Sequence, residues 1–237
     1  MEQQWIAVVG NSPGVGKSTL CRAVARWFTD GGATVDHFEE ADVLTRPAFR
    51  AVADEFAGGH GSVRPRTLVD ASRAYAEETR AAGVDVLVTD ALIPFIPSLV
   101  AWGHDERAIA QVVAGLEAAV EPTRVTVVYL RDVPEKALGR AIEREGPQWA
   151  EWYVGKLGNS PGTRAVKDVA SAADHHRAET ELTLRLLATT RWNVLVADVA
   201  EQDAEETARQ VIGRLHDLLG GGRGYASGDA QPGVVDP

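Results

Sequence analysis

The residues best suited to chemistry lie in one short stretch near the start of the chain, Gly10-Asn11-Ser12-Pro13-Gly14-Val15-Gly16-Lys17-Ser18-Thr19. An apolar run at residues 5–9 precedes this stretch, and a helical pattern follows it. A strand, a glycine-rich turn and a Lys-Ser pair that opens a helix are the setting of a phosphate-binding loop. The sequence therefore predicts a site for the phosphates of a nucleoside triphosphate.

Each part of this loop has an expected role. Successive backbone N–H groups point inward and cradle phosphate oxygens, and the helix N-terminus adds partial positive charge. Lys17 is expected to reach the β- and γ-phosphates, and Ser18 to hold Mg²⁺. The predicted nucleotide-binding residues are Gly14, Val15, Gly16, Lys17, Ser18 and Thr19.

One position departs from the usual pattern G-x-x-x-x-G-K-[ST]. The place of the first glycine is taken by Asn11, and Gly10 lies one residue earlier. Asparagine tolerates left-handed backbone angles, so it is expected to stand in for glycine, unless the loop is one residue longer. The alternative to a nucleotide site is an ordinary glycine-rich turn without a ligand.

Composition narrows the classes of function. The chain has 237 residues and a formal net charge of −10, which argues against a nucleic-acid partner. A single cysteine, Cys21, excludes an internal disulfide and suits a reducing cytosol. There is neither a membrane-spanning apolar run nor a basic and apolar leader, so we expect a cytoplasmic protein. A homodimer stays open.

Hydrophobic patterning predicts a doubly wound α/β domain over residues 1–219. Five apolar runs rich in β-branched residues read as buried parallel strands, at residues 5–9, 34–38, 84–89, 125–130 and 192–197. The expected helices are 17–29, 47–57, 66–82, 105–120, 134–145, 168–190 and 202–219. The Gly-, Ser- and Pro-rich residues 220–237 are predicted to be a disordered tail.

Two segments fit no simple strand–helix pattern, namely 91–104 and 146–167. Both are long, aromatic and rich in Pro or Gly, and such connections are more often functional than idle. We expect 91–104 to form a wall of an acceptor pocket, and 146–167 to be a lid-like segment. Covering the core is the alternative for both.

Carboxylates cluster where the second and third predicted strands end. Glu39, Glu40 and Asp42 follow the second strand, and Asp90 ends the third. Ligands of open α/β sheets bind outside the carboxyl ends of strands, so these side chains are expected to converge near the γ-phosphate. Asp90 has the position of an acidic residue that organises Mg²⁺. The alternatives are a helix or turn cap for Asp90 and a solvated acidic loop for the others. Asp36 and His37 are weaker candidates than these four.

An arginine pair follows the fourth strand. Arg140 and Arg144 are four residues apart and share a helix face that runs into the lid-like segment. Such a pair is suited to neutralising charge on a transferring phosphoryl group. Ion pairing with neighbouring glutamates is the alternative.

Together the loop, the carboxylates and the arginine-bearing segment resemble the P-loop kinases of small molecules, which include nucleoside and nucleotide kinases and antibiotic phosphotransferases. The resemblance implies a three-layer α/β/α fold with a five-stranded parallel sheet in the order 2-3-1-4-5. It also implies ATP and Mg²⁺, and an acidic residue after the second strand that activates an acceptor hydroxyl. The corresponding candidates here are Glu39, Glu40 and Asp42.

The leading hypothesis is an enzyme that moves the γ-phosphoryl group of ATP onto a hydroxyl of a small molecule, such as a nucleoside, a sugar or a nucleoside-like natural product. The carboxylates favour a hydroxyl, because a base can take its proton. A nucleoside monophosphate kinase is the first alternative, since a phosphate acceptor needs arginine clamps more than a base. A non-kinase ATPase or switch is the second. The predicted catalytic residues are Lys17, Glu39, Glu40, Asp42, Asp90, Arg140 and Arg144, with Ser18 and Asp90 at the metal.

Overall fold

A five-stranded parallel sheet forms the centre of the molecule, in the order β2-β3-β1-β4-β5. The computed structural model describes residues 2–39, 42–43, 45–58, 61–90 and 92–220. The strands are β1 (Gln4–Val9), β2 (Val35–Phe38), β3 (Val86–Asp90), β4 (Arg124–Arg131) and β5 (Asn193–Asp198). All five predicted strands are present, within two residues at each end, and the predicted strand order is confirmed.

The helices follow the predicted alternation with the strands, with three differences. They are α1 (Lys17–Asp30), α2 (Arg50–Gly58), α3 (Pro65–Ala81), α4 (Ile96–Ala101), α5 (Glu106–Ala119), α6 (Pro134–Glu145), α7 (Pro147–Asn159), α8 (Val169–Leu187) and α9 (Ala204–Gly220). The helix predicted at 47–57 begins as a 3₁₀ turn, η2 (Pro47–Phe49). Helices α4 and α7 lie in the two segments for which no element was predicted.

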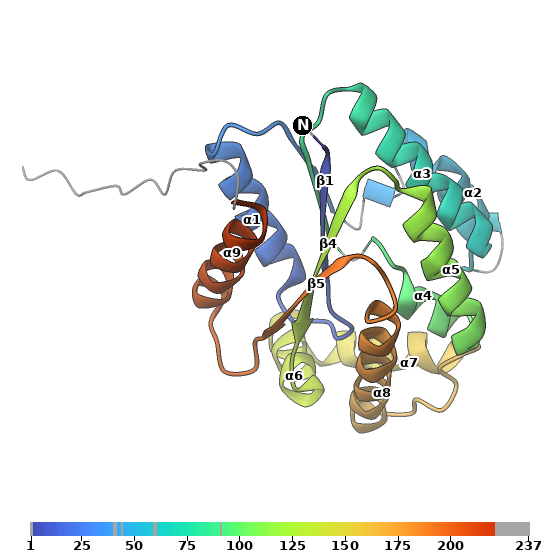
Figure 1. The fold of residues 1–237 in the computed structure, drawn as a ribbon. Coiled ribbons are helices and arrows are strands. Elements are labelled where there is room, and N and C mark those ends of the chain that lie inside the picture. The colour runs from blue at the N-terminus through green and yellow to red at the C-terminus, as the bar shows by residue number, and fades with distance from the viewer. Residues whose placement is uncertain (1, 40–41, 44, 59–60, 91, 221–237) are drawn as a thin grey trace, which may run out of the picture.

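The helices cover both faces of the sheet and so form three layers (Figure 1). Helices α1 and α9 cover one face, and α3 and α5 cover the other, with α4 near them. Helices α6, α7 and α8 gather at the end of the molecule where β1 leads into the phosphate-binding loop. This is the end at which an α/β sheet binds its ligands.

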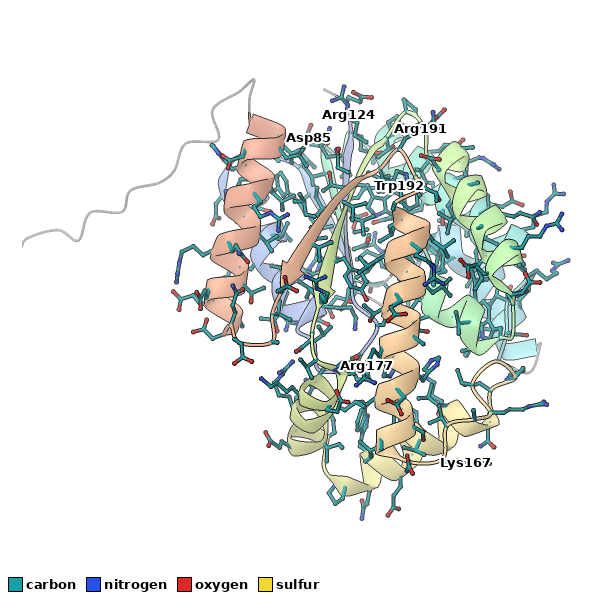
Figure 2. The ribbon with its side chains drawn as sticks, turned by 60° about the horizontal axis from the view of Figure 1, so that its bottom comes forward. Asp85, Arg124, Lys167, Arg177, Arg191 and Trp192 are labelled. Carbon is teal, nitrogen blue, oxygen red and sulfur yellow. The ribbon has the colours of Figure 1, made fainter. Side chains whose placement is uncertain are left out.

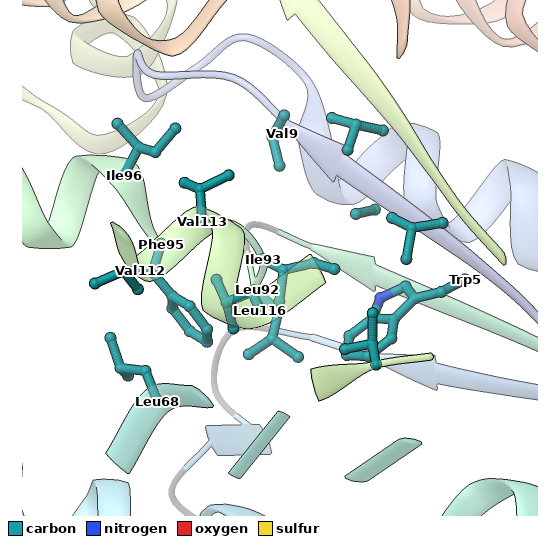
Figure 3. Packing of buried hydrophobic residues seen from close by; sticks show 14 of the residues in the cluster. Trp5, Val9, Leu68, Leu92, Ile93, Phe95, Ile96, Val112, Val113 and Leu116 are labelled. Atoms are coloured by element: carbon teal, nitrogen blue, oxygen red, sulfur yellow. The ribbon is translucent and has the colours of Figure 1, made fainter. Parts of the chain in front are cut away.

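The larger core lies on the α3–α5 face of the sheet (Figure 3). Trp5 is fully buried there, and its indole N–H donates to the Thr89 hydroxyl at 2.9 Å. Leu92, Ile93 and Phe95 are members of the same core. The expectation that segment 91–104 forms an acceptor-pocket wall is therefore wrong for these residues, because their side chains are needed to fill the space between the sheet and α5.

Strand register brings the predicted site residues together. Val8 of β1 lies opposite Asp90 of β3, so the phosphate-binding loop begins one strand away from that carboxylate. On the other side, Val9 lies opposite Tyr129 of β4. The loop is thus held between two buried strands, and the last residues of β3 and β4 flank it.

Ion pairs tie the outer helices to each other and to the loops between them. Arg177 of α8 pairs with Asp174 at 2.6 Å and with Glu135 of α6 (Figure 2). Arg191 pairs with Glu117 at 3.2 Å near the opposite end of the molecule. Such exposed pairs contribute little to stability individually.

The predicted tail at 220–237 lies outside the described residues except for Gly220, which ends α9. No helix in the described part of the chain is long and apolar enough to cross a membrane.

Candidate functional site

The phosphate-binding loop has a backbone that only glycine adopts without strain at two points. Gly14 has φ 79° and Gly16 has φ 96°, both in the left-handed region. A β-carbon on Gly14 would lie 2.3 Å from the carbonyl oxygen of Ala137 in α6. Gly14 therefore serves both the turn and the close approach of α6. Val15, between the two glycines, buries its side chain in the core beneath α1.

The prediction that Asn11 replaces a left-handed glycine is wrong. Phe95 is the one non-glycine residue with a positive φ among the described residues, so Asn11 is not a left-handed stand-in for glycine. Its amide instead anchors the loop. The side-chain nitrogen donates to the Thr183 hydroxyl of α8 at 3.1 Å, and the side-chain oxygen accepts from the Tyr129 hydroxyl at 3.2 Å. Asn11 thus connects the loop to both β4 and α8.

Ser18 and Asp90 meet at the start of α1. The Ser18 hydroxyl donates a hydrogen bond to Oδ2 of Asp90, whose residue is only 4% exposed. The second carboxylate oxygen, Oδ1, is buried and has no hydrogen-bond partner among the described residues. Lys17 folds back over the loop and its ammonium lies 3.5 Å from the carbonyl oxygen of Ser12.

This donor set fits Mg²⁺ and a polyphosphate. Mg²⁺ takes oxygen ligands, usually from one or two protein groups together with substrate phosphates and water. The Ser18 hydroxyl and the unpartnered Oδ1 of Asp90 are two such oxygens at the same point. A buried carboxylate oxygen without a partner is costly, and a cation there would remove the cost.

The pKa of the Cys21 thiol depends on the charges around the first turns of α1. Burial raises the pKa of Cys21, and the neighbouring carboxylates of Asp90 and Glu39 raise it further, while Lys17 lowers it. One sulfur therefore lies within electrostatic range of the loop lysine, the Asp90 carboxylate and the Glu39 carboxylate. The convergence of Glu39 and Asp90 near the γ-phosphate stays a prediction.

The predicted acidic group after β2 separates into different roles. Glu39 is about half exposed and makes one long contact, 3.5 Å from Arg22 of α1. Asp42 accepts from the Glu39 backbone N–H at 2.9 Å, so its carboxylate closes the turn. Glu40 lies outside the described residues.

An ion pair beside this group was not predicted from the sequence. Arg46 donates to both carboxylate oxygens of Asp36 at 2.7 Å, and its guanidinium lies over the rings of Phe38 and Tyr75, at 5.3 and 5.9 Å from their centres. The Asp36 carboxylate raises the pKa of Arg46. Asp36 and Phe38 are two residues apart on β2, so their side chains lie on the same face of the sheet. The alternation along β2 gives the face on which Asp36 lies, but it does not identify Arg46 as the partner of Asp36.

The two arginines of α6 lie in different surroundings. Arg140 points to the phosphate-binding loop, where its Nε donates to the Gly14 carbonyl at 3.3 Å, and it also pairs with the buried carboxylate of Asp132. Arg144 pairs with Glu145 at 2.7 Å and is mostly exposed. Arg140 is therefore the member of the pair that lies at the loop.

The predicted lid-like segment contains α7, which presents aromatic rings on two sides. Trp149 stacks on Tyr153 with ring centres 4.9 Å apart and an angle of 6° between the planes. Trp152 is 58% exposed, and the Lys156 ammonium lies 5.4 Å from the centre of its ring. The first pair faces α8, where Tyr153 meets His176.

Two surface hollows lie near the β2 end of the sheet. One of about 520 Å³ is lined mainly by residues around the start of α3 and the end of α4, including Arg64, Trp102 and His104. A second of about 300 Å³ follows β2 and is lined by residues that include Arg46 and Arg50. None of the predicted catalytic residues lines either hollow, but the second adjoins the Asp36–Arg46 pair.

Known proteins resemble this chain in fold rather than in sequence. No protein-family model and no curated protein matches the sequence. Among solved structures, a thymidylate kinase from Candida albicans is similar, with a TM-score of 0.52 and 13% sequence identity over 92% of this chain and 93% of that one. With its phosphate-binding loop and its sheet order, the chain thus has the three-layer α/β/α fold of the P-loop kinases.

Proposed function

We propose that this protein is an ATP-dependent phosphotransferase that moves the γ-phosphoryl group onto a hydroxyl of a small molecule, with Mg²⁺ as cofactor. The observation that carries the proposal is the Ser18–Asp90 contact at the end of a phosphate-binding loop, with one oxygen of Asp90 left unpartnered. A turn that merely connected a strand to a helix would have no need for a buried carboxylate in that condition.

The residues around the loop divide the work of phosphoryl transfer. Backbone N–H groups of the loop and the Lys17 ammonium are suited to holding phosphate oxygens and stabilising the charge that develops on them. Ser18 and Asp90 would hold Mg²⁺, which neutralises phosphate charge when bound. Arg140 already reaches the loop at the Gly14 carbonyl, so its guanidinium has a short path to a phosphate there.

Glu39 is the carboxylate best suited to activating the acceptor. A general base needs a free carboxylate oxygen within reach of the acceptor proton. Asp42 uses an oxygen to close its turn, and Asp36 uses both of its oxygens on Arg46. Glu39 makes only a long contact with Arg22, and it lies within electrostatic range of the same thiol as Asp90 and Lys17.

A nucleoside monophosphate kinase is the second candidate function. Its support is the hollow after β2, which Arg46 and Arg50 line and which could receive an acceptor phosphate. The fold neighbour is named a thymidylate kinase, and thymidylate is a nucleoside monophosphate. The Arg46 guanidinium is already paired with Asp36, which leaves Arg50 as the main clamp for a phosphate.

The test is a phosphorylation screen. Purified protein is incubated with Mg²⁺-ATP and separate pools of nucleosides, nucleoside monophosphates, sugars and nucleoside-like or aminoglycoside antibiotics, and mass spectrometry follows the gain of a phosphoryl group. A product from a neutral hydroxyl compound supports the leading proposal, and a product from monophosphates alone supports the second candidate. ATP hydrolysis without a phosphorylated product contradicts both and indicates an ATPase or switch. The Lys17→Ala variant is the control, and it should lose about 10²–10³-fold in rate.

A further inference from the structure

Three side chains of metal-binding type meet on one turn of α8, away from the Ser18–Asp90 site. His175, His176 and Glu179 each offer one ligand atom, and these atoms lie within 4.8 Å of one another. The side chains of His176 and Glu179 are 3% and 2% exposed, and that of His175 is 15% exposed. Within the described part of the chain, this is the one such group of histidine, cysteine and acidic side chains.

The distances in this group are long for hydrogen bonds and match the spacing of ligands around an ion. Nδ1 of His176 lies 3.4 Å from one Glu179 oxygen, and Nε2 of His175 lies 3.6 Å from the other. An N–H···O hydrogen bond is usually about 2.7–3.2 Å long. Ligands about 2.0–2.2 Å from a tetrahedral zinc ion are separated by about 3.4 Å from each other. Each histidine nitrogen therefore stands at about the ligand–ligand distance from the carboxylate.

The buried Glu179 carboxylate needs a partner that carries positive charge or donates hydrogen bonds. The Glu179 side chain is almost fully buried, and its two oxygens face ring nitrogens of His175 and His176. A buried carboxylate is stable as an anion only when it is paired or coordinates a metal. Its polar side-chain partners are the two imidazoles, which bind metal ions in their neutral form.

Tyr153 supplies the outer partner that a metal-bound histidine requires. Its hydroxyl lies 2.8 Å from Nε2 of His176, the ring nitrogen that faces away from Glu179. When Nδ1 ligates a metal, Nε2 carries the proton and needs an acceptor, and a hydrogen-bonded partner of this kind fixes the ring. The phenol oxygen of Tyr153 is placed to be that acceptor.

We propose that His175, His176 and Glu179 form a binding site for a zinc-class divalent cation, which fastens α7 to α8 through Tyr153. Two imidazoles and one carboxylate favour zinc and its transition-metal neighbours over Mg²⁺ or Ca²⁺, which take oxygen ligands. Three protein ligands leave a fourth tetrahedral position for water or an added ligand.

The first experiment uses cobalt as a spectroscopic probe on the purified full-length protein after chelator treatment. Co²⁺ bound to nitrogen and oxygen ligands in a tetrahedral site gives visible absorption bands, and Zn²⁺ displaces it with loss of those bands. We expect one equivalent of Co²⁺ to produce the bands and one equivalent of Zn²⁺ to remove them. No bands and no retained zinc by elemental analysis would overturn the proposal. The readout does not depend on the kinase activity, so failure of either proposal leaves the other standing.

Variants then show where the ion binds. His175→Gln and Glu179→Gln should each weaken Zn²⁺ binding by at least about 100-fold, since each removes a ligand, whereas Tyr153→Phe should weaken it by about 10–100-fold, as loss of an outer partner does. His216→Gln is the matched control, because His216 lies on α9 and is 47% exposed. Wild-type affinity in both ligand variants would overturn the assignment. If circular dichroism shows that a ligand variant is unfolded, Tyr153→Phe and the wild-type cobalt spectrum decide the question.

Discussion

A β-carbon on Gly14 would lie 2.3 Å from the carbonyl oxygen of Ala137, closer than two such atoms ever stand. The phosphate-binding loop and α6 are therefore packed backbone against backbone. We predict that Gly14→Ala destabilises the protein by more than the roughly 1–2 kcal/mol that a left-handed alanine costs, because α6 must also shift. Gly16→Ala is the control, since Gly16 has φ 96° but nothing within 4 Å of its would-be β-carbon. Urea unfolding measures both, and equal losses would contradict the packing argument.

Asp90 is expected to govern the use of Mg²⁺. We predict that Asp90→Asn lowers kcat/KM for Mg²⁺-ATP by about 10–100-fold and raises the Mg²⁺ concentration needed for half-maximal rate, because an amide is a poorer partner for the ion and for Ser18. A titration of rate against Mg²⁺ at fixed ATP makes the measurement. An unchanged Mg²⁺ dependence would leave Asp90 as a hydrogen-bond partner of Ser18 and nothing more.

Kinetic measurements on variants can distinguish the roles of the carboxylates after β2. Glu39→Gln should lower kcat by about 10²–10⁴-fold with little change in ATP affinity, as loss of a general base does. Asp42→Asn should have a smaller effect, because its carboxylate already closes the turn at the Glu39 backbone. Glu40→Gln completes the set. Wild-type rates in all three variants would transfer the base role to Asp90 or show that the acceptor needs none.

Acid stability depends in part on Glu55. Hydrogen bonds from the Arg64 side chain, the Thr67 hydroxyl and the Arg64 backbone lower the pKa of Glu55 from 4.5 to about 2. A lowered folded-state pKa gives stability that is present above the unfolded value and is lost as pH falls from about 4.5 through about 2. Glu55→Gln should therefore flatten the decline of the urea midpoint over this range. Glu205→Gln, at an 88% exposed position on α9, is the control and should leave the decline unchanged.

The sequence was sufficient to predict most of the fold. Strands that are buried on both faces of a sheet have continuous apolar runs. Such a run can be recognised without knowing which face each side chain occupies, so all five strands were predicted. Helices α4 and α7 were missed because each begins with a proline near its first turn and lies within a segment rich in breakers. Proline is tolerated at that position, so the breaker signal misled there.

The candidate site was predicted only where a motif fixes the spacing. The loop glycines, Lys17 and Ser18 follow from such a motif, and the position of Asp90 follows from the end of a buried strand. The roles of Asp36 and Asn11 did not follow, because each depends on a partner distant in sequence or unrelated in type. Arg46 lies ten residues from Asp36, and Thr183 lies 172 residues from Asn11. No periodic pattern carries that information.

The hydrogen bond between Asn11 and Thr183 forms part of a direct connection between the two proposed sites. Thr183 accepts from the loop amide at 3.1 Å and donates to the Glu179 carbonyl at 2.8 Å, so one hydroxyl joins the nucleotide loop to the helix turn that carries the proposed metal ligands. Linkage is reciprocal, so if zinc tightens nucleotide binding by some factor, the nucleotide must tighten zinc binding by the same factor. Breaking the contact with Asn11→Ala should therefore weaken the dependence of each affinity on the other ligand.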